Sequence, residues 1–204
     1  MLYKYVYKSI AALVALCVFP LTIYAPMIYA MGEVAIGKTS IYDEMSLYRI
    51  YFNFLRGHEG GFELSESVRA TMPALITAGV FYGLALLIAA AIAVTAFACR
   101  SRLPVLILSG AGLLCMIGVF IAFKQFALPY TSGAVGVNDI GAFGSGILAS
   151  LIGAALKITD LHLSTGAIFS AGAFVVVLLW TGAFMLVDLG DKDAAKVKKP
   201  VHHH

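Results

Sequence analysis

Four long segments without a charged side chain constrain the fold of this protein more than any other feature of its sequence. Residues 9–32, 70–99, 103–123 and 164–187 contain no Asp, Glu, Lys or Arg. Each is at least as long as the roughly 20 apolar residues with which an α-helix crosses a hydrocarbon core about 30 Å thick. We therefore expect membrane-spanning helices at about 9–31, 70–98, 103–123 and 164–187.

The composition supports lipid as the surrounding medium. Hydrophobic residues make up 61% of the chain and charged residues 12%, whereas soluble domains average about 45–50% and about 25%. The net charge of +3 gives no indication of a nucleic-acid partner. We predict one integral membrane domain over residues 1–199. Residues 200–204 end in three histidines, which is typical of the start of an expression tag.

Basic residues predict the orientation of these helices. Arg100 and Arg102 lie in the short turn between the second and third segments, and Lys8 precedes the first. Cytoplasmic loops carry an excess of Lys and Arg. The sequence thus predicts a multi-pass protein of the cell membrane with both termini cytoplasmic. Its outer loops cover about 32–69 and 124–163.

The first outer loop shows a helical pattern. Ser40 followed by Asp43 is similar to a capping box, and apolar residues recur at helical spacing up to Gly57. Tyr48, Phe52 and Leu55 would form the apolar face of this helix. We interpret residues 40–57 as a helix lying at the outer membrane interface, with that face as an interaction surface.

The second outer loop contains a stripe of small residues at every fourth position: Ala142, Gly146, Ser150 and Ala154. On a helix these residues share one face, which lets another backbone approach closely. A helix over the 17 residues from Gly141 to Lys157 would be about 25 Å long, short of a full span. The segment is predicted to lie on the outer leaflet or to dip into it. A plain extracellular amphipathic helix, a re-entrant helix and a fifth membrane span stay alternatives.

A second small-residue motif occurs inside the spans. Gly79 and Gly83 form GxxxG in the second one, a spacing that favours close helix packing. We expect these glycines to pack within the bundle or, alternatively, against a second copy or a partner.

Catalytic and metal-binding residues are few. The four spans lack the ionisable groups that mark proton relays and ion paths. Two histidines and two carboxylates in the outer loops, His58, Glu59, Asp160 and His162, are the only candidate zinc ligands. Their spacing matches no helical ligand pair, and no second histidine follows HEGG to complete HExxH. The sequence predicts no enzyme, no metal site and no cofactor.

The predicted fold class is an all-α, four-transmembrane-helix bundle with two outer loops that contain short interfacial or re-entrant helices. This layout is similar to that of claudins and related tetraspan proteins. The claudin first loop carries Trp and Cys, whereas residues 33–69 contain neither, so no residue role is transferred. The sequence favours a noncatalytic tetraspan protein whose outer loops contact membrane lipids, a second copy or a partner membrane protein. The alternative is an oligomeric channel or a small subunit of a transport complex.

Overall fold

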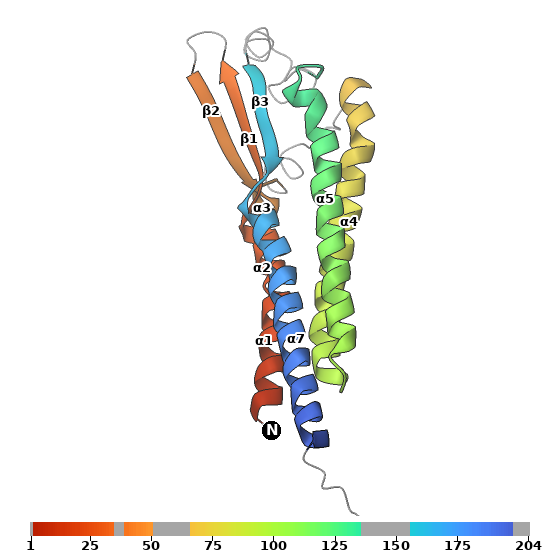
Figure 1. Ribbon diagram of the computed structural model, residues 1–204. Coiled ribbons are helices and arrows are strands. Elements are labelled where there is room, and N and C mark those ends of the chain that lie inside the picture. Colours follow the sequence, from red (N-terminus) through yellow and green to blue (C-terminus); the bar gives the residue numbers. More distant parts are fainter. Residues whose placement is uncertain (1, 35–38, 51–65, 136–155, 198–204) are drawn as a thin grey trace, which may run out of the picture.

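The computed structural model describes residues 2–34, 39–50, 66–135 and 156–197 (Figure 1). It is mostly helical. Four helices are long and apolar enough to cross a membrane: Tyr5–Tyr24, Arg69–Ala98, Leu103–Thr131 and Thr165–Asp188. The expectation of four such helices is confirmed.

The first of these helices ends earlier than predicted and is interrupted near its middle, and both features involve a proline. It consists of α1 (Leu2–Leu16) and α2 (Val18–Tyr24), which are separated at Cys17. Pro20 has no N–H to donate to the carbonyl of Leu16, which accounts for the break. Pro26 disfavours helical backbone at the preceding residue, and Ala25 is extended, with φ −75° and ψ 149°. The predicted span over 9–31 is therefore wrong at its end, where residues 26–31 belong to a β-strand.

The next two helices form an antiparallel hairpin around a tight turn, as predicted. They are α4 (Glu66–Ala98) and α5 (Leu103–Thr131). The predicted span at 103–123 stopped before Lys124, but one lysine does not interrupt a helix. The helix α5 ends instead before Gly133, whose φ of +79° suits glycine. The last helix, α7 (Thr165–Val197), also extends beyond its predicted end.

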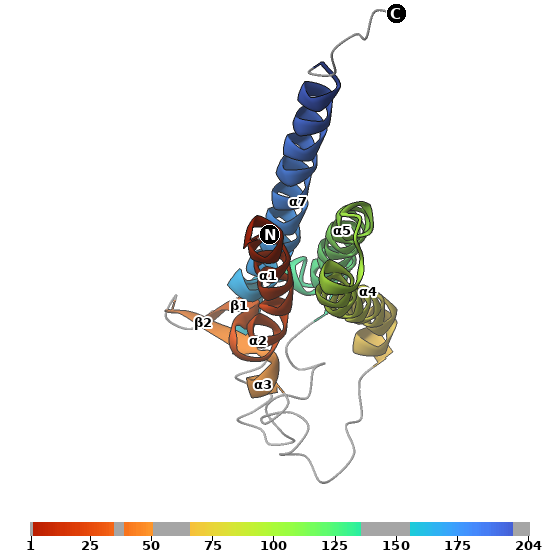
Figure 2. The ribbon, with the colours of Figure 1, turned by 90° about the horizontal axis from the view of Figure 1, so that it is seen from below.

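The four helices pack as a bundle. The helix α5 contacts α4 and α7, and α1 contacts α4 and α7, as the view along the bundle shows (Figure 2). Fully buried side chains from all four include Val18, Ala85, Ile92, Met116, Phe174 and Val177. We call the end with the α4–α5 turn and the first residues of α1 the inner end of the bundle. The C-terminal part of α7 lies at the same end (Figure 1).

A three-stranded antiparallel sheet stands at the opposite, outer end (Figure 1). Its strands are β1 (Pro26–Val34), β2 (Thr39–Ser46) and β3 (Leu156–Leu163), in the order β2-β1-β3. The strand β1 follows α2 directly, and β3 leads into α7. The sheet thus joins the two outer segments, and the prediction of an all-α fold is wrong in this respect.

The predicted outer helix over 40–57 is wrong for its first part. Residues 39–46 form β2, paired with β1 through partners such as Ala30 and Asp43. Residues 47–50 form the helix α3 (Leu47–Ile50), and residues 51–57 lie outside the described part of the chain. The helical spacing of a few apolar residues predicts a helix only weakly. An adjacent strand edge offers backbone hydrogen bonds and therefore favours a strand. At the other end, the helix predicted over 140–157 is wrong at residues 156 and 157, which begin β3.

A bulge in β3 explains why its strand pattern is hard to recognise. Met31 pairs with Asp160 and Gly32 with Ile158, which leaves Thr159 without a partner. The extra residue shifts the two-residue alternation by one position. Ile158 and Leu161, three positions apart, consequently both pack against the outer end of α5, around Tyr130.

Candidate functional site

Most residues singled out in the outer loops lie outside the described part of the structure. These are His58, Glu59, Phe52, Leu55, Ala142, Gly146, Ser150 and Ala154. Tyr48 is described. It lies in α3 with 51% of its surface exposed, and its ring is 6.4 Å from that of Tyr24. The interfacial face and the small-residue stripe stay predictions.

The other two candidate metal ligands are neighbours on β3. His162 Nδ1 lies 3.1 Å from Asp160 Oδ1, and the His162 ring stacks on Tyr29 at 4.8 Å. About half of each side chain, 53% and 52%, is exposed. Within the described ranges, no three His, Cys, Asp or Glu side chains lie close enough together to hold a metal ion. Of the four candidate ligands, the structure thus places Asp160 and His162 beside each other. His58 and Glu59 lie outside the described residues.

Asp160 and His162 line a groove between β3 and α5, which we call the outer groove. Its volume is about 570 Å³. The α5 wall contributes Phe120, Phe123, Lys124, Ala127, Leu128 and Thr131, and the β3 wall contributes residues 159–163. The helical residues recur at steps of three and four, so they form one face of α5. The groove has aromatic and aliphatic walls, with one lysine, one aspartate and one histidine along them.

A second opening lies between β1, α4 and α5, and we call it the apolar hollow. It has a volume of about 380 Å³, and Gly79, Gly83, Leu86, Val119 and Phe123 are among its lining residues. A Cβ atom built at Gly79 or Gly83 would have no described neighbour within 4 Å. In the described chain this GxxxG motif therefore borders an opening and is not packed against another helix.

Tyr82 fixes the position of the helices beside this hollow. Its hydroxyl lies 2.7 Å from Thr22 Oγ1 on α2 and 3.2 Å from Ser170 Oγ on α7. Thr22 and Ser170 donate their own protons to the carbonyls of Val18 and Gly166, each at 2.7 Å. The Tyr82 hydroxyl has one proton, and the shorter contact indicates that it donates to Thr22. Three helices thus share one buried group of hydroxyls.

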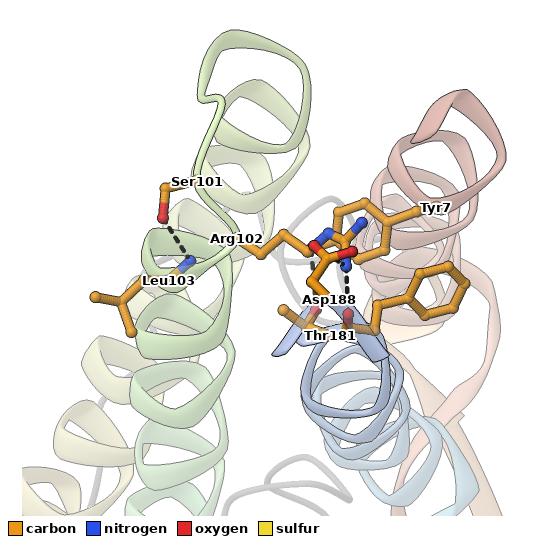
Figure 3. A network of polar contacts seen from close by, with 7 residues as sticks. Tyr7, Ser101, Arg102, Leu103, Thr181 and Asp188 are labelled. Carbon is orange, nitrogen blue, oxygen red and sulfur yellow. Dashed lines mark hydrogen bonds and ion pairs between the residues drawn. The ribbon is translucent and has the colours of Figure 1, made fainter. Parts of the chain in front are cut away.

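A polar cluster ties the helices together at the inner end (Figure 3). Arg102 is 11% exposed, and its guanidinium lies 2.8 Å from Asp188 on α7. It also donates to the carbonyl of Phe184 and lies 4.8 Å from the centre of the Tyr7 ring on α1. The Tyr7 hydroxyl is in turn 3.2 Å from Thr181 Oγ1. We call Tyr7, Arg102, Thr181, Phe184 and Asp188 the inner cluster.

Lys8 makes a further inner contact. Its ammonium donates to the carbonyls of Phe97 and Cys99, at 3.0 and 3.4 Å. The last carbonyls of a helix have no partner within it and attract a cation. Lys8 and Arg102, read from the sequence only as orientation signals, are therefore also structural ties between helices.

Three features were not predicted from the sequence: the outer groove, the inner cluster, and the contacts among the hydroxyls of Tyr82, Thr22 and Ser170. The sequence contains both partners of the ion pair in the inner cluster, because Arg102 directly precedes one apolar segment and Asp188 directly follows another, but it does not show that the two side chains meet. No protein-family model and no curated protein sequence matches this chain. The functional interpretation therefore depends on the geometry alone.

Proposed function

We propose that this chain is a noncatalytic multi-pass membrane protein that contacts a partner protein, a second copy of itself or lipid through its outer end. The observation that carries the proposal is the sheet, in which β1 and β3 continue directly from α2 and into α7. A sheet anchored to two helices is a stable surface for recognition, since it needs little ordering on binding.

The flanks of the bundle support a lipid environment. Large apolar side chains with 66–70% of their surface exposed occur on several helices, among them Leu87 on α4, Leu114 on α5 and Leu179 on α7. In water such a surface would cause aggregation, whereas in a bilayer it meets acyl chains. We infer that the four helices span the membrane.

The charges at the inner end support the proposed orientation. Lys8, Arg100 and Arg102 cluster there, and the positive-inside rule assigns such an end to the cytoplasm. The sheet then faces the outside of the cell. Lys157, exposed at the start of β3, is on that outer surface.

Crosslinking on intact cells tests the partner and the orientation together. A membrane-impermeant, amine-reactive crosslinker should join the wild-type chain to a partner or to a second copy. Lys157→Arg keeps the charge but removes one of the reactive amines on the proposed outer side, which also has Lys38 and Lys124, so the yield should fall. Lys8→Arg, the matched control at the inner end, should leave the yield unchanged.

The outcomes separate the two parts of the proposal. Products that form only with a membrane-permeant crosslinker would show that the orientation is reversed. A lone monomer with both reagents would contradict the proposed interaction at the outer end.

A further inference from the structure

We propose that the outer groove binds one phospholipid with a zwitterionic headgroup, its phosphate on Lys124 and its amine near Asp160. The inference rests on the proposed placement of the helices in a membrane. It names a ligand for one part of the outer end, the outer groove between α5 and β3.

The length of α5 places the groove at the membrane boundary. Arg102 caps the first turn of α5, and Lys124 follows 22 residues later. At 1.5 Å per residue this separation is about 33 Å, close to the roughly 30 Å thickness of the hydrocarbon core. With Arg102 at the inner boundary, Lys124 lies at the level of the outer headgroups.

The polarity of the groove changes across this level. On the bundle side of Lys124 the walls are Phe120 and Phe123 of α5, together with Leu163, the β3 residue nearest α7. Beyond Lys124 the α5 wall continues with Ala127 and Leu128 and ends at Thr131, and the β3 wall adds the polar Thr159 and Asp160. An acyl chain fits the first part, and a glycerol phosphate with its headgroup fits the second.

The charges of the groove are complementary to a zwitterion. Among the described residues, no carboxylate forms an ion pair with Lys124, which leaves its three N–H donors for a phosphate. Asp160 contacts His162 through Oδ1, and a carboxylate has further acceptor sites for an ammonium group. The charges of one lysine and one aspartate sum to zero, as do the charges of the phosphate and the amine in such a headgroup.

The volume of the groove is consistent with this occupant. Small-molecule sites measure roughly 300–1,000 Å³, and the outer groove has about 570 Å³. A headgroup and the first part of one chain would occupy it, while the remaining chain would lie along the exposed flank of α5.

Native mass spectrometry of the full chain tests the proposal. Protein purified in a mild detergent is stripped of lipid and mixed with equal amounts of phosphatidylethanolamine, phosphatidylcholine, phosphatidylglycerol and diacylglycerol. We expect one phosphatidylethanolamine per chain to be retained preferentially, because its primary amine can donate to Asp160. Lys124→Gln should lower this retention about tenfold, the loss expected for a charge-assisted hydrogen bond.

The controls isolate the groove. Lys157→Gln removes the same charge from the same end of the molecule but lies outside the groove, so retention should match wild type. Asp160→Asn should reduce the preference for phosphatidylethanolamine over phosphatidylcholine. Unchanged thermal unfolding of Lys124→Gln would show that the fold is intact, as expected for an exposed side chain.

Three results would overturn the proposal. They are equal retention by wild type and Lys124→Gln, equal retention of diacylglycerol, and preferential retention of phosphatidylglycerol. A dimer without lipid that Lys124→Gln dissociates would assign the groove to a second copy instead. Crosslinking through the sheet does not depend on the groove, so a failure here together with a crosslinked partner would remove only the lipid site.

Discussion

The α5–α7 contact at Gly112 and the α4 face at Gly79 and Gly83 pack differently, although both contain small residues. The position that a Cβ of Gly112 on α5 would occupy is 2.3 Å from the Phe174 ring of α7, and the inner cluster ties α1, α5 and α7. On α4, Gly79 and Gly83 border an opening of about 380 Å³. Small side chains permit close approach, but a large side chain must fill the space they leave.

Charged residues also differ between the two ends of the bundle. At the inner end Arg102 is paired with Asp188, and Lys8 is bound to helix carbonyls. At the outer end, Lys124 lines a groove without an ion-pair partner among the described residues. We infer that Arg102 and Lys8 stabilise the fold and that Lys124 is available for binding. Substitutions at these sites and at the glycines can test both distinctions.

The largest loss of stability is expected for Arg102→Ala. The substitution removes the contacts of Arg102 with Asp188, with the Phe184 carbonyl and with the Tyr7 ring. Breaking a buried ion pair costs about 3–5 kcal/mol. Asp188 is 48% exposed, so solvent screens the pair in part, and we expect the free energy of unfolding to fall by about 2 kcal/mol. Denaturant unfolding in mixed micelles would measure it.

Arg100→Ala is the matched control for this substitution, because Arg100 is an exposed neighbour in the same turn. Its effect should stay within about 0.5 kcal/mol, as for most surface substitutions. Equal losses for the two variants would contradict a structural role for the inner cluster.

Gly112→Ala should have the next largest effect. The added methyl group would overlap Phe174, which is 1% exposed and cannot move aside freely. Overpacking costs about 1–3 kcal/mol, partly offset by the better helix propensity of alanine, so we expect a net loss of about 1.5 kcal/mol. Phe174→Leu in the same chain should restore part of it.

Gly79→Ala on α4 provides the contrast. Its methyl group would meet no described atom within 4 Å, so stability should be unchanged or higher by up to about 1 kcal/mol. Destabilisation as large as that of Gly112→Ala would show that the α4 face at Gly79 is packed as tightly as the α5–α7 contact.

A smaller loss than that of Gly112→Ala is expected for Tyr82→Phe. Thr22 and Ser170 keep their bonds to helix carbonyls, so only the contacts of the Tyr82 hydroxyl are lost. A net hydrogen bond contributes about 1 kcal/mol, and unfolding measured as above should show a loss of this size. A loss above about 3 kcal/mol would mean that this hydroxyl also holds the apolar hollow open.

The helices could be predicted because a helix long enough to cross lipid requires apolar side chains along its whole length. The existence of all four followed from the absence of charge, but their ends depended on local chemistry. Pro26 ends the first helix, whereas Lys124 does not end the third. Where a charge-free segment stops is therefore a poor guide to where a helix stops.

The sheet and the outer groove could not be predicted in the same way. The strand β3 pairs with residues far away in the sequence, and the bulge at Thr159 disrupts its alternation. The groove requires both the extension of α5 beyond residue 123 and the presence of β3 beside it. Asp160 and His162 were recognised as a notable pair, but their relation to Lys124 appears only when these two elements are placed together.

The position of β1 in the centre of the sheet has a consequence for biogenesis. The β1–β2 hairpin can form early, but the other edge of β1 pairs with residues 156–163. At a synthesis rate of about 5–20 residues per second, β3 is synthesised roughly 6–25 seconds after β1. During this interval the nascent chain presents an open strand edge, the kind of surface that chaperones protect and that aggregates when left exposed.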